Sequence, residues 1–427
     1  MRSQPSTQVP APAQRPSPGQ RDSQKTFPPG FPRLAAIAIL FLCLPGAPFP
    51  AASLAIGMRD DVPAADYLAL ANNEAPFPPG KFPDFLPVAA VGTLGRDGEF
   101  EIVGSGTLIA PEWVLTAAHV ALSGKRGQDF ESNLEVRFGP RARAPRSRHR
   151  VTGVATPLPP SALRSLLRTG PKVSESEVIH AEFHDLALLH LATPVPDITP
   201  SPLEASAEPL SGKRIFIAGY GDAATGNNPK ARTWTQADLK RAAENRVDRE
   251  IARNPYNPRT VGAILLFDFD NGTEERNSLN RRSKSWEHLF GQGKSEAAPT
   301  PMEGASYPGD SGGPAFAQSS KGDWAVVGIS GYGTGFPPDR RRTSIQYGEI
   351  LVYTRVSPHL DWIRSHLAPP NPAPPSASVS RAGPAAEVGA PDASSRVTAT
   401  ASPVSAEAPP PIFRPPPAPP APGPMAH

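Results

Sequence analysis

The hexapeptide GDSGGP, residues 309–314, says more about this chain than any other stretch. A serine hydroxyl is a weak nucleophile that needs a base beside it, and the oxyanion formed by its attack needs hydrogen-bond donors already in place. Gly309 lacks a Cβ, so the backbone can turn and direct its own N–H and that of Ser311 towards one point. A short Gly/Ser/Asp cluster is usually only a turn. The complete hexapeptide predicts a nucleophile at Ser311 and an oxyanion hole from Gly309 and Ser311.

Two upstream segments supply the matching base and carboxylate. His119 ends the segment LTAAH, in which small residues let a buried strand deliver an imidazole to the edge of a cleft. A lone histidine in such a place is more often structural. Asp185 opens the apolar segment DLALL, where burial of a carboxylate must be offset by hydrogen bonds such as those to a histidine ring. We predict His119 as general base and Asp185 as its orienting carboxylate. Adjacent residues of an extended chain face opposite ways, so His184 should point away from Asp185.

Short β-type runs separated by Gly, Pro and polar turns fill the central region. They favour an all-β barrel or sandwich over an α/β fold. Residues 357–367 read as one amphipathic helix that closes the domain. Two polar stretches, 142–177 and 222–260, are predicted surface excursions, the second with a helix near 236–251. The candidate strands are 88–94, 100–109, 134–138, 214–220, 263–269, 324–330 and 350–356.

The three segments, in the order His119, Asp185, Ser311, resemble the signature blocks of the trypsin-like peptidases. The resemblance covers about residues 84–367, and residues 222–300 are similar to secreted bacterial members. Further matching blocks are VGSGTLI at 103–109, IAGYG at 217–221, GISGYG at 328–333 and VYTRV at 352–356.

The resemblance implies two packed six-stranded antiparallel β-barrels (chymotrypsin-like), about 84–205 and 206–355, followed by the helix 357–367. It also implies a serine endopeptidase that hydrolyses peptide bonds through an acyl-enzyme, with a protein or peptide substrate and no metal or organic cofactor. One alternative is a catalytically silent binding or envelope-associated module, although the intact site residues argue against it. Another is a periplasmic quality-control protease, which would need a peptide-binding domain after the barrels.

Activation and substrate preference follow from the same resemblance. Family members become active when a new N-terminal ammonium, on Ile or Val followed by Gly, pairs with the aspartate before the nucleophile. Here the aspartate is Asp310, and Ile56 precedes Gly57. The floor of the primary substrate pocket falls on Ala305 rather than an aspartate, so cleavage after Lys or Arg is not expected. The resemblance puts Gly333 on one wall and Leu351 where it narrows the pocket, which favours a small or medium apolar side chain.

Both ends of the chain differ in character from its centre. The apolar run at residues 34–44 is too short to span a bilayer but fits a secretory signal, with Ser53 and Ala55 before a cleavage point at Ile56. Residues 1–55 are therefore predicted as an N-terminal extension and signal peptide, which implies a secreted or periplasmic protein, and residues 56–83 as a lead-in. Residues 368–427 are rich in Pro, Ala and Ser and are predicted to be a disordered tail.

Composition excludes several classes of function. Formal charges of 43 Lys+Arg and 40 Asp+Glu are too balanced for a nucleic-acid binder. The single cysteine, Cys43, lies in the predicted leader, so a processed chain has neither a disulfide nor a thiolate–zinc site. Asp268, Asp270 and Glu274 fall short of an EF-hand spacing. We expect a monomer without a metal, a nucleic-acid partner or an integral membrane segment.

Overall fold

The structure of the chain is a computed structural model that describes nine segments. They are residues 56–95, 97–122, 133–167, 183–205, 208–227, 238–252, 262–280, 292–334 and 346–368. The predicted signal peptide at 1–55 and the predicted tail from residue 369 onwards lie outside the described residues.

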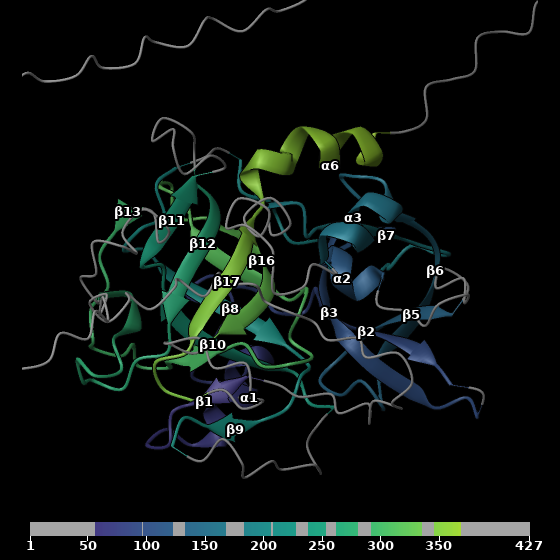
Figure 1. Cartoon of the computed structure of the whole chain (residues 1–427). Helices are drawn as coiled ribbons and strands as arrows, with labels where there is room; N and C mark the ends of the chain where they lie inside the picture. The colour runs from purple at the N-terminus through teal and green to yellow at the C-terminus, as the bar shows by residue number, and fades with distance from the viewer. Residues whose placement is uncertain are drawn as a thin grey trace, which may run out of the picture. The chain divides into compact units, whose positions relative to one another are not determined.

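The first half is a closed antiparallel barrel in the order β2-β3-β4-β7-β6-β5 (Figure 1). Gly92 permits the close crossing of its first two strands, because a Cβ there would lie 2.4 Å from the carbonyl oxygen of Glu101. The register shifts at this point, between Val91 and Gly92, as expected for a β-bulge. The six strands are β2 (Val88–Leu94), β3 (Phe100–Ala110), β4 (Trp113–Thr116), β5 (Leu134–Phe138), β6 (Ser147–Ala155) and β7 (Ala187–Leu191).

The second half is an eight-stranded sheet in the order β10-β8-β15-β16-β17-β12-β11-β13. The first six strands in this order correspond to the six strands predicted for the second barrel. The sheet curls into a half-barrel instead of closing. Beyond these six strands, β12 pairs with β11, and helix α1 (Ala64–Ala71) packs on β10. The strands are β8 (Arg214–Gly219), β10 (Arg241–Arg246), β11 (Arg249–Ala252), β12 (Gly262–Asp268), β13 (Gln292–Gly293), β15 (Pro314–Gln318), β16 (Trp324–Thr334) and β17 (Ile350–Arg355).

Residues 56–83 are integrated into the second half. Strand β1 (Gly57–Met58) lies between β14 (Gly304–Ala305) and β9 (Ala224–Thr225) in a small three-stranded sheet. Tyr67 of α1 is buried and donates its hydroxyl to the carbonyl oxygen of Glu303 at 2.8 Å. Figure 1 shows β1, β9 and α1 together beside the eight-stranded sheet.

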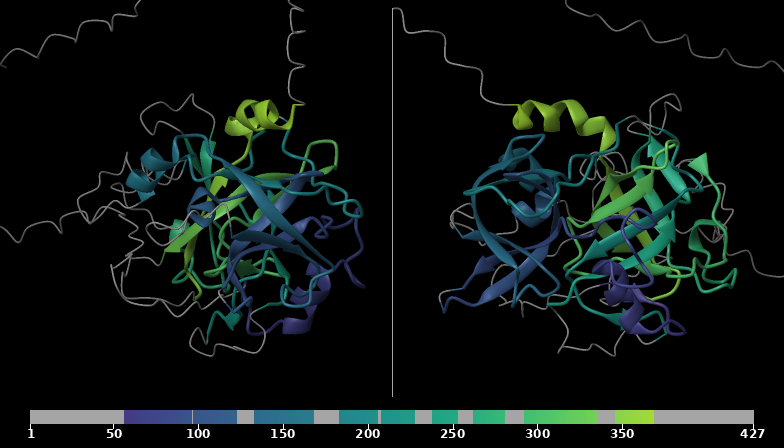
Figure 2. Two further views of the ribbon diagram at one scale, coloured as in Figure 1. Left: turned by 90° about the vertical axis from the view of Figure 1, so that its right-hand side faces the viewer. Right: turned by 180° about the vertical axis from the view of Figure 1, so that it is seen from behind.

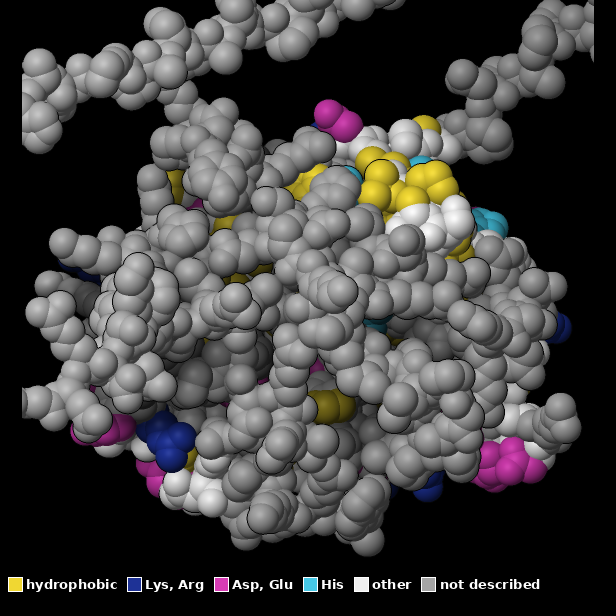
Figure 3. Space-filling model, viewed as in Figure 1, with side chains coloured by type: hydrophobic (Ala, Val, Ile, Leu, Met, Phe, Trp, Pro, Cys, Tyr) yellow, Lys and Arg dark blue, Asp and Glu magenta, His cyan; other side chains and the backbone are white. Residues whose placement is uncertain are grey.

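The predicted closing helix consists of a 3-10 turn, Ser357–His359, and helix α6 (Leu360–Leu367). Seen from behind in Figure 2, α6 extends from the second half towards the first barrel. The ring of His366 on α6 lies 6.2 Å, centroid to centroid, from that of Trp113 on β4. Hydrophobic side chains are visible over α6 in Figure 3. The helix therefore packs across both halves.

Two secondary-structure predictions were wrong. The stretch 142–177 contains β6, an integral strand of the closed barrel, and helix α3 (Pro160–Leu167). The helix predicted near 236–251 is replaced by strands β10 and β11. Pairing of β10 with β8 and its burial under α1 override the helical propensity of its alanines and charged residues.

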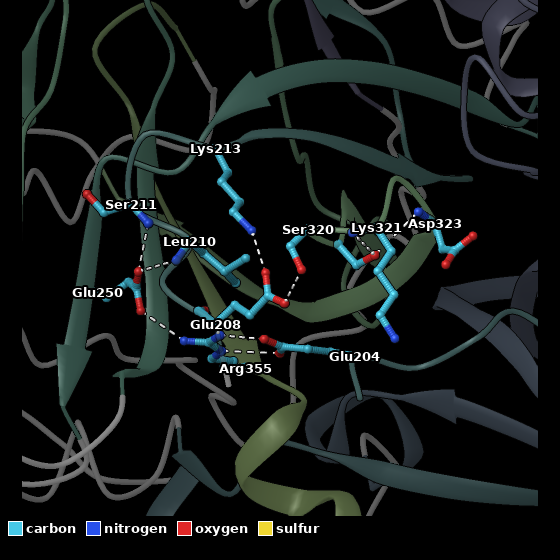
Figure 4. A network of polar contacts seen from close by, with 11 residues as sticks. Glu204, Glu208, Leu210, Ser211, Lys213, Glu250, Ser320, Lys321, Asp323 and Arg355 are labelled. Atoms are coloured by element: carbon cyan, nitrogen blue, oxygen red, sulfur yellow. Dashed lines mark hydrogen bonds and ion pairs between the residues drawn. The ribbon is translucent and has the colours of Figure 1, made fainter. Parts of the chain in front are cut away.

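A buried ionic network joins the segment after the first barrel to the second half (Figure 4). The guanidinium of Arg355 on β17 is fully buried and donates to both carboxylate oxygens of Glu204. It also donates to Glu250 of β11 at 2.9 Å and to the carbonyl oxygen of Glu208. A buried charge needs such partners, so the network fixes the connection between the halves.

Candidate active site

His119 and Asp185 meet at one end of the first barrel. His119 lies on the short helix α2 (Ala118–Ala121), just after β4, and Asp185 lies just before β7. The two strands pair, with Thr116 opposite Ala187, so both residues emerge at the same edge. Asp185 Oδ2 lies 2.7 Å from Nδ1 of His119, and Oδ1 accepts the backbone N–H of His119 at 2.8 Å.

Both side chains of this contact are largely shielded from water, which strengthens the hydrogen bond between them. The side chain of Asp185 is 2% exposed and that of His119 is 14% exposed. An ionised carboxylate only accepts hydrogen bonds, so the neutral imidazole that suits this contact has its proton on Nδ1 and an acceptor at Nε2. His184 has other partners: its ring packs against those of Phe183, at 4.6 Å, and His359, at 6.0 Å.

The loop with Ser311 comes from the second half and packs against the segment that leads to His119. Gly312 has φ +82°, and a Cβ there would lie 2.1 Å from Oγ1 of Thr116 and 2.9 Å from the nitrogen of Ala117. Only glycine allows this approach. The Ser311 hydroxyl makes one long contact, at 3.4 Å, with the carbonyl oxygen of Gly331.

The turn before Ser311 has a shape that depends on glycine. Tyr307, Pro308, Gly309 and Asp310 form it, closed by a 2.9 Å bond from the N–H of Asp310 to the carbonyl oxygen of Tyr307. Gly309 has φ +98° at the third position, and proline occupies the second. These are the features of a type II turn, which requires a positive φ at its third residue.

Asp310 is buried behind this turn. Its carboxylate accepts the N–H groups of Tyr307, at 2.8 Å, and Gly221, at 3.0 Å. Burial nevertheless raises the pKa of Asp310 to about 8. The nearby positive charge of Arg241 opposes this rise in pKa, and the negative charge of Asp222 adds to it.

Arg241 and Asp222 were not singled out from the sequence. Arg241 is buried and lies directly opposite Gly219 in the pairing of β10 with β8, and Gly219 borders the carboxylate of Asp310. Cross-strand partners face the same side of a sheet, so the guanidinium and the carboxylate share one buried region. The sequence gives no local indication that either charge is buried, because both lie in a polar stretch that was predicted to be on the surface.

The predicted activation residue Ile56 is fully buried and directly precedes β1. Its neighbour Gly57 pairs with Ala305 on one side and with Ala224 on the other. These partners lie close in sequence to Tyr307 and Asp222, so β1 leads towards the surroundings of Asp310. In the full chain the nitrogen of Ile56 is an amide, and an ion pair with Asp310 requires cleavage before Ile56.

The predicted pocket residues lie on two sheets. Gly333 of β16 and Leu351 of β17 are cross-strand partners, the first exposed and the second fully buried. Ala305 is fully buried on β14 and bonded to β1. The hydroxyl of Tyr353 bonds to Ser306 and Ser330, which connects β17 to the segment after Ala305.

A comparison with known protein families agrees with this architecture. Residues 104–329, more than half of the chain, match the model of the trypsin-like peptidase domain. The chain belongs to the trypsin-like peptidase family. Its closed barrel, curled half-barrel and C-terminal helix make a chymotrypsin-like fold, as predicted from the sequence.

One similar curated protein is vitamin K-dependent protein C of Oryctolagus cuniculus. It is 45% identical over 71 residues, which make up 16% of this chain and 14% of that protein. The chain therefore spans a small part of the length of this relative. Among the described residues, no helix is long and apolar enough to cross a membrane, and no group of three or more His, Cys, Asp or Glu is arranged to hold a metal ion.

Proposed function

We propose that this trypsin-like peptidase is an active serine endopeptidase with His119, Asp185 and Ser311 as its catalytic triad. The observation that carries the proposal is the double contact of Asp185 with the ring and the backbone of His119. It leaves Nε2 to accept the proton of the Ser311 hydroxyl. The same nitrogen then returns the proton to the leaving amine.

The second element of the proposal is the oxyanion hole. Attack by Ser311 forms an acyl-enzyme through a tetrahedral intermediate whose oxygen carries a negative charge. The type II turn favours N–H groups of Gly309 and Ser311 that point to one side, where they stabilise that charge. Such donors act without reorganisation where the turn is formed before the substrate binds.

We further propose a small or medium apolar side chain for the residue before the cleaved bond. Ala305 offers no charge to a Lys or Arg side chain, and the buried Leu351 opposite Gly333 takes up space at the pocket. Replacing Leu351 with Gly should shift cleavage towards larger apolar residues, measured on a peptide library. An unchanged profile would remove Leu351 from the pocket.

The leader supports a proposal of export to the periplasm or the exterior, with cleavage before Ile56. It is tested by the N-terminal sequence of the protein recovered from outside the cytoplasm. The long N-terminal and C-terminal segments would belong to the same exported chain before processing.

A fluorophosphonate probe, which reacts with activated serines, tests the triad. Protein purified after export should be labelled, Ser311→Ala should abolish labelling, and Asp185→Asn should slow peptide hydrolysis about 10⁴-fold by favouring the wrong histidine tautomer. Ser365→Ala, in an exposed position on α6, is the control and should label fully. Folded wild-type protein without labelling would favour the silent binding module instead.

A further inference from the structure

We propose that Ser105 is a positioning residue that holds the oxyanion turn in its working shape. Ser105 is fully buried on β3 of the first barrel, yet most of its hydrogen bonds cross to the second half. Its hydroxyl donates to the carbonyl oxygen of Gly309 at 3.0 Å and accepts the N–H of Tyr220 at 3.0 Å. Its backbone N–H donates to the carbonyl oxygen of Ser311 at 2.7 Å. The inference rests on the proposed function.

The position of these bonds along the chain explains their effect. The peptide between Gly309 and Asp310 is held on one side by the Ser105 hydroxyl and on the other by the bond from Asp310 to Tyr307. The peptide between Ser311 and Gly312 is held by the Ser105 N–H and by a 2.8 Å bond from Gly312 to Ser330. The intervening peptide carries the Ser311 N–H. A planar peptide moves as a unit. Ser105 therefore fixes the two peptide planes on either side of the Ser311 N–H. The first of these planes also follows the peptide that carries the Gly309 N–H.

The same residue also connects the turn to the base. Its carbonyl oxygen accepts the hydroxyl of Thr116 at 2.7 Å, three residues before His119. The nucleophile and the base lie on different halves, so a residue bonded to both sides sets their relative position. Ser105 thus links Gly309, Ser311 and the strand end that carries His119.

Covalent bracing of this region is not available to the chain. Cys43 is its single cysteine, so no internal disulfide can form. Beside Ser105, a Cβ at Gly104 would lie 2.6 Å from Cγ2 of Val120 and 2.8 Å from the Ser311 carbonyl oxygen, so the two halves touch here without side-chain padding. Hydrogen bonds are left to restrain the turn, and the Ser105 hydroxyl supplies one of them from the first barrel.

The test compares Ser105→Ala and Ser105→Cys with Thr107→Val. Thr107 is also fully buried on β3, and its hydroxyl pairs with Ser201 at 3.1 Å, away from the turn. Each variant removes or weakens one buried hydroxyl, so their thermal unfolding midpoints should fall by similar amounts. Rates are expressed per competent site, counted by fluorophosphonate titration of the full exported protein.

The expected result separates positioning from stability. Ser105→Ala should lower kcat about tenfold to a hundredfold with KM nearly unchanged, since loss of a direct oxyanion donor costs about 10²–10³ and Ser105 acts one step away. Ser105→Cys, with a weak S–H donor, should fall between Ser105→Ala and the wild type. The inhibition constant of a peptide aldehyde, whose adduct places an oxyanion in the hole, should rise by the same factor as kcat falls. Thr107→Val should keep the wild-type kcat.

Two outcomes would count against different claims. An active wild type with equal kcat values for Ser105→Ala and Thr107→Val would overturn the role of Ser105 and leave the peptidase intact. A wild type that neither hydrolyses peptides nor reacts with the probe would overturn the proposed function itself.

Discussion

The carboxylate of Asp310 occupies the space that a side chain at Gly219 would need. A Cβ atom at Gly219 would lie 2.2 Å from Oδ1 of Asp310 and 2.9 Å from its Cγ. These distances are well inside van der Waals contact. The packing of β8 against the turn before Ser311 thus depends on the absence of one methyl group, and it ties the position of Asp310 to the sheet.

We therefore expect Gly219→Ala to displace Asp310 and with it the turn that carries Gly309. Labelling of Ser311 by a fluorophosphonate should slow at least 100-fold, and overpacking should cost about 1–3 kcal/mol of stability. Gly153→Ala on β6 is the control, because the nearest atom to its new Cβ would be 3.6 Å away. Wild-type labelling by Gly219→Ala would mean that the turn does not depend on Asp310.

The buried network at Arg355 predicts an asymmetry between two ion pairs in the same region. Arg355→Ala leaves the buried Glu204 without its cation and should destabilise the protein by about 3–5 kcal/mol. Lys213→Ala removes the pair with Glu208, in which both side chains are 33% exposed, and should cost less than about 1 kcal/mol. Urea unfolding measures both values. Similar losses in the two variants would show that the Arg355 network adds no more than a surface pair.

Glu303 predicts a decline of stability at alkaline pH. It is buried, with Oε2 accepting the N–H and the hydroxyl of Thr300, and burial raises its pKa from 4.5 to about 8. Because the folded pKa lies above the unfolded one, the contribution to stability is complete below pH 4.5 and is lost as pH rises through 8. This loss amounts to a few kcal/mol.

The measurement is the difference between the thermal unfolding midpoints at pH 5 and pH 9. Glu303→Gln stays neutral, so its midpoint should fall less than that of the wild type. Glu99→Gln, an exposed position in the turn between β2 and β3, should behave as the wild type. A fall in Glu303→Gln as steep as in the wild type would assign the alkaline loss to other buried acids, such as Asp310.

Strands with a local signal could be predicted from the sequence almost to the residue. The expected strands 88–94 and 134–138 coincide with β2 and β5. The first is a mostly apolar run and the second alternates apolar and charged residues, and a glycine follows each of them. Strand β10 could not be predicted, since Arg241, Glu244 and Asn245 read as an exposed helix. Their burial depends on β8 and α1, which come from distant parts of the chain.

The residues of the candidate site also differ in whether the sequence predicts their contacts. Conspicuous motifs led to the expectation that Asp185 orients His119, and the two are hydrogen-bonded in the structure. The Ser105 hydroxyl has no signal of its own inside the block VGSGTLI, because its partner Gly309 is 204 residues away. No periodicity or spacing along the chain encodes a contact of that kind.

Cleavage before Ile56 would change how the charge of Asp310 is neutralised. Burial opposes the charged carboxylate, whereas the positive charge of Arg241 favours it. An ammonium on Ile56 close to Asp310 would favour it further, since opposite charges attract strongly where water is excluded. Protein cleaved directly before Ile56 should therefore label at least tenfold faster than protein that keeps Ala55, which adds a residue and moves the ammonium. Fluorophosphonate labelling of the two forms, each released from a fusion by a specific protease, makes the comparison. Equal rates would assign the neutralising charge to Arg241 alone. If an Arg241→Met variant then lost labelling, the oxyanion turn of this peptidase would form without a new N-terminus.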